Sequence, residues 1–248
     1  MKFWAPLLIA VLCLCAANVA SAQDRWTGFY IGGNAGVAFG NSNVTTSPSN
    51  DTYFDPDNLP VVARAGKGSI STTGFTGGGQ AGYNMQSGNL VFGGEVGFDA
   101  LSLSGSRTAA NVPFLSGCCN FTIKESVKTN WLLTARPRIG WAFGPANSWL
   151  VDLSAGLAVT DLRSSNVFLD FPGGVNETAS KTQTEIGWTA GTSLAYGLDA
   201  HWSAKLEYLF VDFGGISLNG TAVSRGQTFS HSADLQAHIL RAALNYKF

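Results

Sequence analysis

Nine charged residues stand among apolar and small neighbours at alternating positions of the chain, and they are the first candidates for chemistry. In a β-strand, residues two apart share a face, so each of these charges lies opposite a row of apolar side chains. Acids and bases that share one surface can pair with one another or line a pathway for small solutes. The nine are Glu95, Asp99, Arg136, Arg138, Asp152, Lys205, Glu207, Arg241 and Lys247.

Enzymatic chemistry has little support in the residue pattern. The chain has three histidines, of which we expect His201 in a turn, His231 in a loop and His238 on an apolar face near a strand end. No Ser–His or Cys–His arrangement can be assembled from these positions. We therefore predict that the protein is not an enzyme and that it has no catalytic residues and no cofactor.

Three further patterns also have a simpler structural interpretation. Residues 77–82 match G-x-G-x-x-G, but a tight turn and a strand follow where the dinucleotide motif needs a helix. The oxygen-bearing residues Asp51, Asp55, Asp57 and Asn58 match no calcium-loop spacing, so we predict no metal site. A net charge of −1 without a basic block gives no reason to expect nucleic acid.

The first residues indicate export. Lys2 precedes an apolar run over 3–17, and Ala20, Ser21 and Ala22 supply the small residues that a signal peptidase reads. We predict residues 1–22 to be a signal peptide cleaved after Ala22, and residues 23–248 to form one domain. Cys13 and Cys15 leave with this peptide, and the adjacent Cys118 and Cys119 cannot join distant strands.

Period-2 alternation predicts eight strands in the mature chain. Tight turns are expected at 86–89, 144–148 and 198–201, and long polar loops at 41–71, 102–127, 162–184 and 214–234. Each strand exceeds the ~9–11 residues that a tilted membrane strand needs. The predicted strands cover 26–39, 72–85, 90–101, 128–143, 149–161, 185–197, 202–213 and 235–248.

The distribution of apolar and aromatic residues predicts the fold class. No stretch after Ala22 is apolar enough to cross a bilayer as a helix, and aromatic residues gather near both ends of the predicted strands. A membrane-spanning chain must then satisfy its backbone polar groups as a closed barrel. We predict an all-β protein, an eight-stranded antiparallel up-and-down transmembrane β-barrel, with a bulge or kink at Pro137.

The predicted fold sets the role of the nine charges. The interior of an eight-stranded barrel is just wide enough for its own side chains. An unpaired charge enclosed there would cost several kcal/mol. We therefore predict that the nine charges form an ion-pair network that plugs the lumen; a selective pore is the alternative.

Both ends of the mature chain carry a resemblance to a known family. Residues 26–36 read Trp-Thr-Gly-Phe-Tyr-Ile-Gly-Gly-Asn-Ala-Gly, and residues 206–214 read Leu-Glu-Tyr-Leu-Phe-Val-Asp-Phe-Gly. With the C-terminal His-Ile-Leu-Arg-Ala-Ala-Leu-Asn-Tyr-Lys-Phe, the chain resembles the outer-membrane immunogenic (porin-like) proteins of alphaproteobacteria, within the OmpA-like eight-stranded barrels. The resemblance implies an integral outer-membrane barrel without an enzymatic site. The terminal Phe248 resembles the signal read by the barrel-assembly machinery.

The expected function follows from these inferences. The leading hypothesis is a structural barrel in the outer membrane of a Gram-negative cell, which displays its loops outside. A narrow porin and a loop-mediated adhesin or ligand-binding protein are the alternatives. The expected partners are outer-membrane lipid, lipopolysaccharide and, during biogenesis, the barrel-assembly machinery; no host or envelope partner can be named.

Overall fold

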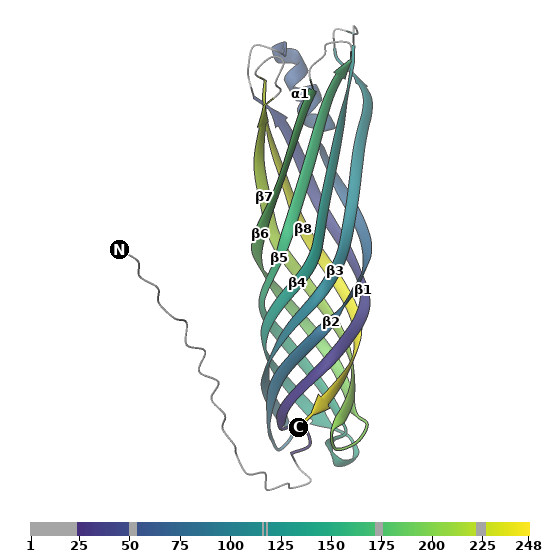
Figure 1. The fold of residues 1–248 in the computed structure, drawn as a ribbon, viewed down its shortest axis with the longest axis vertical. Helices are drawn as coiled ribbons and strands as arrows, with labels where there is room; N and C mark the ends of the chain where they lie inside the picture. The colour runs from purple at the N-terminus through teal and green to yellow at the C-terminus, as the bar shows by residue number, and fades with distance from the viewer. Residues whose placement is uncertain (1–23, 50–53, 116, 118, 172–175, 222–226) are drawn as a thin grey trace, which may run out of the picture.

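Each strand of the molecule pairs with the next one along the chain, and the last strand pairs with the first. The computed structural model describes residues 24–49, 54–115, 117, 119–171, 176–221 and 227–248. All pairs are antiparallel and close a barrel (Figure 1), as predicted. The strands are β1 (Gly28–Pro48), β2 (Lys67–Ser87), β3 (Leu90–Pro113), β4 (Asn120–Phe143), β5 (Trp149–Phe171), β6 (Asn176–Gly197), β7 (Trp202–Thr221) and β8 (Thr228–Lys247).

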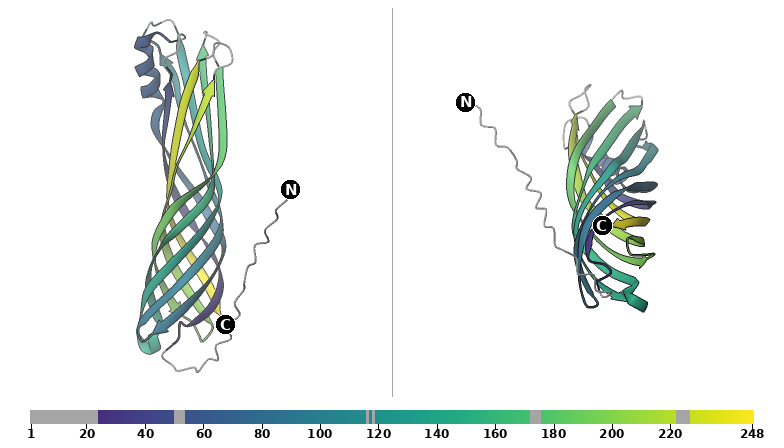
Figure 2. Two further views of the ribbon diagram at one scale, coloured as in Figure 1. Left: turned by 90° about the vertical axis from the view of Figure 1, so that its left-hand side faces the viewer. Right: turned by 60° about the horizontal axis from the view of Figure 1, so that its bottom comes forward.

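The two ends of the barrel differ. The turn end carries the tight turns, including the short helix η2 (Pro145–Asn147), and the C-terminus, where the Phe248 amide donates to the Phe29 carbonyl at 3.0 Å. The rim end carries η1 (Pro56–Asn58) and α1 (Leu59–Ala65), visible opposite the C-terminus in Figure 2. The predicted signal peptide and its cleavage site at Ala22 lie outside the described residues. No helix in the described ranges is long and apolar enough to cross a membrane.

The strands extend well beyond their predicted limits toward the rim end. β3 continues to Pro113 and β4 begins at Asn120, although a loop was predicted over 102–127. The same correction applies to the loops predicted at 41–71, 162–184 and 214–234, large parts of which are strand. The predicted strand limits at the turn end agree with the structure to within about two residues.

The outward face of the barrel explains this error. In the half near the turn end the outward residues are apolar, as with Phe75 and Phe98, and the inward residues include the charges. In the half near the rim end the outward residues are polar, as with Ser102 and Ser104 on β3, while Leu101 and Leu103 point inward and are buried. Alternation therefore continues with inverted polarity, and its serine-rich outward face was mistaken for a loop.

Three irregularities lie near the level at which the polarity inverts. The register shifts by one residue after Ala100 on β3, after Lys128 on β4 and after Asp212 on β7. A bulge of this kind changes which positions face inward. On β7 it includes Gly214 at φ 69°, a backbone conformation that favours glycine. On β4 and β7 the buried positions change parity at this level, between Leu132 and Thr129 and between Phe213 and Ile216, whereas on β3 Leu101 and Leu103 keep the parity of the buried Asp99.

Pro137 causes neither the predicted bulge nor a register shift. It pairs with Gly94 of β3 in a continuous register. Toward β5 the pairing omits Arg136 and Pro137 and resumes at Arg138 opposite Ser154 with the same offset as before. The expected bulge is therefore wrong, because the loss of one donor interrupts the ladder locally without requiring an extra residue.

One seam of the barrel lacks backbone pairing in the rim half. β6 and β7 pair from Trp188 and Asp212 down to Gly197 and Ser203. Among the described residues, 176–187 of β6 pair only with β5, and 215–221 of β7 pair only with β8. We call this boundary the seam; an open hollow of about 620 Å³ lies on it, lined by residues that include Lys181 and Ser217.

The interior is filled in layers along the barrel axis. Near the turn end, a small apolar cluster includes Trp26 and Leu150. Beyond the charged residues lies the middle apolar layer, and α1 covers a rim cluster made of Phe54, Val62, Phe114, Phe121, Ile123, Phe168 and Phe229. The middle apolar layer comprises Ala38, Val44, Ile70, Leu101, Leu103, Val127, Leu132, Ala158, Leu162, Leu209, Val211, Phe213, Ile216, Ala233, Leu235, Ala237 and Ile239.

Candidate functional site

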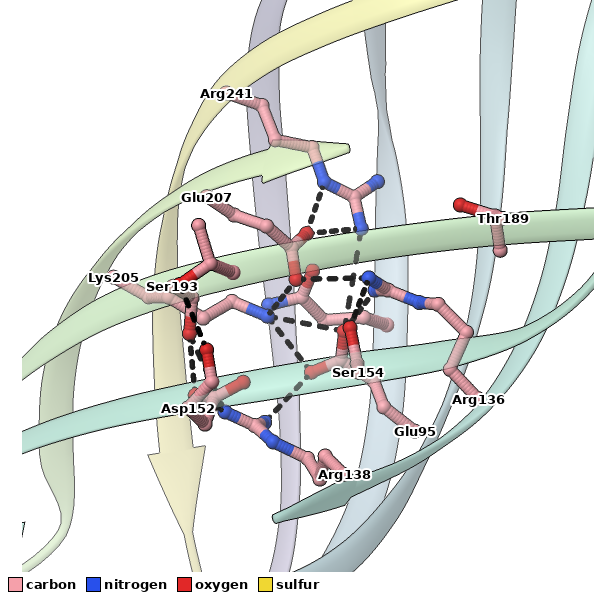
Figure 3. A network of polar contacts seen from close by, with 12 residues as sticks. Glu95, Arg136, Arg138, Asp152, Ser154, Thr189, Ser193, Lys205, Glu207 and Arg241 are labelled. Carbon is pink, nitrogen blue, oxygen red and sulfur yellow. Dashed lines mark hydrogen bonds and ion pairs between the residues drawn. The ribbon is translucent and has the colours of Figure 1, made fainter. Parts of the chain in front are cut away.

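Eight of the nine predicted charged residues meet inside the barrel, where their side chains form a connected layer. Figure 3 labels all of them except Asp99. All eight are buried, and they come from five strands. Four are acidic and four are basic, so their formal charges cancel. We call these residues the charged layer: Glu95, Asp99, Arg136, Arg138, Asp152, Lys205, Glu207 and Arg241.

Glu95 on β3 is the centre of one part of the charged layer. Its carboxylate accepts from Arg136 at 2.7 Å, from Lys205 at 2.8 Å and from Arg138 at 3.2 Å. The Tyr30 hydroxyl of β1 also donates to it at 2.8 Å. Three cations around one carboxylate leave positive charge that the neighbouring acids must balance.

Glu207 on β7 is the second centre. Its carboxylate lies 2.6 Å from the Arg241 guanidinium and 3.1 Å from that of Arg136. Arg241 also binds Asp99 at 2.6 Å, and the Asn34 amide donates to the same Asp99 carboxylate at 2.8 Å. Arg136 therefore joins the two centres, since it contacts both glutamates.

Asp152 on β5 completes the layer. It accepts from the Arg138 guanidinium and from the Ser193 hydroxyl. Each acid of the layer therefore has at least one cation as partner. Buried ions that are fully paired avoid the penalty of several kcal/mol that an isolated buried ion carries.

Lys247 does not join the charged layer. Its ammonium donates to the Arg25 carbonyl and lines a hollow at the turn end. The alternation pattern correctly gives it the inward parity of Arg241, but six residues of a strand separate the two by about 20 Å along β8. Parity predicts the face on which a residue lies and not its height in the barrel.

The sequence analysis did not identify two residues that contact the charged layer, and it predicted the wrong location for one histidine. Tyr30 and Asn34 of β1 touch the charged layer, and the alternation of β1 could have revealed them. His231 was expected in a loop but is buried on β8, beside Thr46 and Glu177. This prediction failed because the rim half of β8 was read as part of a loop.

The remaining candidate residues lie near the surface or outside the described ranges. His201 is in an exposed turn, and the exposed His238 pairs with the Tyr208 hydroxyl at 2.7 Å. The described residues contain no group of three or more His, Cys, Asp or Glu placed to hold a metal ion. Asp51 and Cys118 are outside the described residues, while Cys119 packs against the rim cluster.

A closed barrel with an apolar outward belt and charges enclosed in its lumen is the architecture of a transmembrane β-barrel. The family model for the outer membrane protein beta-barrel domain matches residues 7–248. The chain belongs to this family, and the cell outer membrane is its location.

Relatives and solved structures agree with this assignment. The chain is 33% identical to the 31 kDa outer-membrane immunogenic protein of Brucella melitensis, over 94% of this chain and 89% of that protein. It is 26% identical to a 22 kDa outer membrane protein of Rhizobium leguminosarum, over 81% of this chain and 72% of that protein. The outer membrane protein OprG of Pseudomonas aeruginosa has a similar fold, with a TM-score of 0.51 at 13% identity, over 91% of this chain and 98% of that chain.

Membership of this class orients the barrel. Outer-membrane barrels have short turns in the periplasm and their longer extensions outside the cell. The turn end is therefore the periplasmic end, and the rim half extends from the membrane toward the cell exterior.

Proposed function

We propose that this protein is a structural barrel of the outer membrane, with a closed lumen and a rigid extension displayed outside the cell. The observation that carries the proposal is the sequence of layers in the lumen. The charged layer is followed by the middle apolar layer, whose side chains are almost all inaccessible to solvent. An ion on this path would have to separate buried ion pairs and then enter an apolar region, and both steps are costly.

The extension suits surface display. Its core is apolar, its outward face is rich in serine and threonine, and α1 covers the rim cluster. These properties are those of a water-soluble barrel, which would hold its outer wall in a fixed shape above the lipopolysaccharide. The display surface is then mostly the strand walls rather than flexible loops.

A narrow porin is the second candidate, and the charged layer is the observation that favours it. Charged side chains from opposite walls of a lumen could select ions if water reached them. The middle apolar layer opposes this function because it interrupts a continuous column of water.

A conductance measurement separates the two candidates. We expect purified protein refolded in a planar bilayer to show no steady open level, in wild type and in Glu95→Gln alike. Because Glu95 contacts three cations, a conducting lumen would change its ion selectivity in this variant. A steady wild-type conductance whose selectivity shifts in Glu95→Gln would refute the closed lumen.

A binding role at the rim is the third candidate, and the segment that contains α1 gives it a test, because its Asp55, Asp57 and Arg64 are exposed although Val62 is buried in the rim cluster. Replacing residues 55–66 by a short glycine–serine linker should abolish binding to a host surface or envelope ligand while the barrel still folds. Unchanged binding of whole cells would exclude this segment as the adhesive site.

The outer-membrane location suggests partners in the membrane and in the assembly pathway. We propose that lipid and lipopolysaccharide surround the outward belt and that the barrel-assembly machinery recognises Phe248, whose side chain is 67% exposed at the end of the chain. Deletion of Phe248 should then lower the amount of barrel in the outer membrane of cells while leaving refolding in detergent unchanged. We also propose that the protein has no enzymatic activity, which hydrolase assays on the refolded protein would test.

A further inference from the structure

A second group of polar residues, four of them buried, lies in the extension, above the middle apolar layer. It links five strands through Thr46 on β1, Arg107 on β3, Glu125 on β4, Glu177 on β6 and His231 on β8. The side chains of Glu125, Glu177 and His231 are at most 2% exposed. We call these five residues the upper polar group; none of them was among the predicted site residues.

The hydrogen bonds in this group can be counted proton by proton. The Thr46 hydroxyl lies 2.8 Å from Glu125 Oε1 and 2.9 Å from His231 Nδ1, and His231 Nε2 lies 3.2 Å from Glu177 Oε1. An ionised carboxylate only accepts, and a hydroxyl has one proton to donate. Nε2 must therefore donate to Glu177, and the Thr46 proton goes to Glu125.

If His231 is neutral, its single N–H is at Nε2, and the contact between Nδ1 and the Thr46 oxygen then has no proton to form a hydrogen bond. An N–H at Nδ1 that donates to the Thr46 oxygen satisfies every contact. The network thus needs one more proton than a neutral histidine with two ionised glutamates provides. Imidazole is the most basic of the three candidate groups, so the proton belongs on His231.

The charges lead to the same conclusion. Arg107 pairs with Glu125 at 2.9 Å, which leaves Glu177 as a carboxylate at most 1% exposed. Among the described residues, a neutral His231 would leave that charge without a cation at hydrogen-bonding distance, whereas an imidazolium balances it. Asp170 on β5 is a further buried acid of the extension and has interactions of its own.

The position of this pair gives it a mechanical role. Glu177 lies on β6 and His231 on β8, so their contact passes β7 at the seam, where β6 and β7 have no backbone pairing among the described residues. Gly220 of β7 makes room for it, because a Cβ there would lie 1.7 Å from Glu177 Oε1. The other polar bridge across the described part of the seam is the exposed contact of Lys181 with the Ser217 carbonyl.

We propose that His231 is an imidazolium in the folded protein and that its ion pair with Glu177 fastens the seam between β6 and β7. Loss of this proton at high pH removes the positive charge and the donor at Nδ1, and so breaks the pair. The seam then opens and exposes the unpaired edges of 176–187 and 215–221. This inference does not depend on whether the lumen conducts.

The protonation state can be observed directly because the chain has only three histidines. In the double variant His201→Gln, His238→Gln, the imidazole nitrogen NMR spectrum of the refolded barrel reports His231 alone. We expect both ring nitrogens to be protonated at about pH 7.5, where a free imidazole is largely neutral. A neutral ring in an intact barrel at that pH, or a proton found on Glu125 or Glu177 instead, would overturn the assignment.

Amide hydrogen exchange tests the fastening role. We consider the backbone amides of 176–187 and 215–221 and correct their exchange rates for the intrinsic dependence on pH. At pH values where His231 has lost its proton, the equilibrium constant for opening at these amides should rise by up to about tenfold per pH unit, because opening is coupled to the release of one proton. Amides shared by β2 and β3 should show no such rise.

Three variants test whether His231 causes this pH dependence. His231→Gln should abolish it, and Glu177→Gln serves the same purpose should His231→Gln not fold. His238→Gln, the control, should retain it. A pH dependence that persists in His231→Gln or Glu177→Gln would refute the proposal.

Discussion

Arg241 shows how strongly a single residue of this barrel depends on its partners. Its side chain is completely inaccessible to solvent, and its guanidinium contacts Glu207 and Asp99. Such an ion is tolerated in the lumen because its charge is neutralised at hydrogen-bonding distance. Removing one partner of a buried pair leaves the other charge uncompensated and typically costs 3–5 kcal/mol.

We therefore expect Arg241→Met to lower the free energy of unfolding by roughly 3–5 kcal/mol. Lys247→Met is the matched control on the same strand, since Lys247 donates to a backbone carbonyl and pairs with no acid among the described residues. Its effect should stay below about 1 kcal/mol. Urea unfolding in detergent micelles, followed by heat-modifiable migration on gels, measures both. Equal losses in the two variants would contradict the difference in their surroundings.

The residue scale also shows what sequence can predict about a site. Alternation gave the inward face of all nine charges, because the period of a strand is fixed by its geometry. It could not show that Lys247 lies far below Arg241, since height depends on strand tilt and stagger. The burial of His231 was missed because its strand was not recognised so far from the membrane.

At the scale of elements, close approach between strands depends on particular glycines. A Cβ at Gly36 of β1 would lie 2.2 Å from the Leu240 carbonyl oxygen of β8, so a side chain there would push the two strands apart. At Gly33 on the same strand the nearest atom to such a Cβ is 3.8 Å away. The two positions differ in space rather than in backbone conformation.

We expect Gly36→Ala to destabilise the barrel by about 1–3 kcal/mol, as overpacking usually does. Gly33→Ala should change stability by no more than about 0.5 kcal/mol. Chemical unfolding of both variants in the same micelles provides the comparison. A destabilisation of Gly33→Ala as large as that of Gly36→Ala would show that flexibility, and not contact, governs these sites.

The sequence predicted where each strand ends on the periplasmic side but not where it ends toward the cell exterior. At the periplasmic end the tight turns interrupt alternation, so the limits were visible in the sequence. Toward the exterior, β3 and β4 lose their apolar outward residues at the membrane edge but remain strands. The predicted limits therefore marked where the lipid ends rather than where pairing ends.

The whole molecule consists of two stacked halves with opposite polarity. Lipid requires apolar residues outside, whereas water requires them inside, and one continuous set of strands satisfies both. On β2, the outward Phe75 is 76% exposed, and Ser71 lies on the same face four residues further toward the rim. About 13 Å of strand separates them.

We expect this interval to contain the membrane surface. In a variant whose Cys118 and Cys119 are replaced by serine, a spin label on Phe75→Cys should be accessible to oxygen in the hydrocarbon. A label on Ser71→Cys should instead be accessible to a water-soluble nickel chelate. Similar accessibility profiles at the two sites would place the boundary elsewhere and contradict the division into two halves.

The pairing of β1 with β8 has a consequence for how the chain can be connected. Because Phe248 binds the backbone of Phe29, the start of β1 and the end of the chain lie side by side at the periplasmic end. A short linker could join them, and new termini could be opened in the tight turn at 144–148 without altering any strand pair. We therefore expect circular permutants, in which Phe248 is no longer the last residue, to reach the same strand order on refolding in detergent.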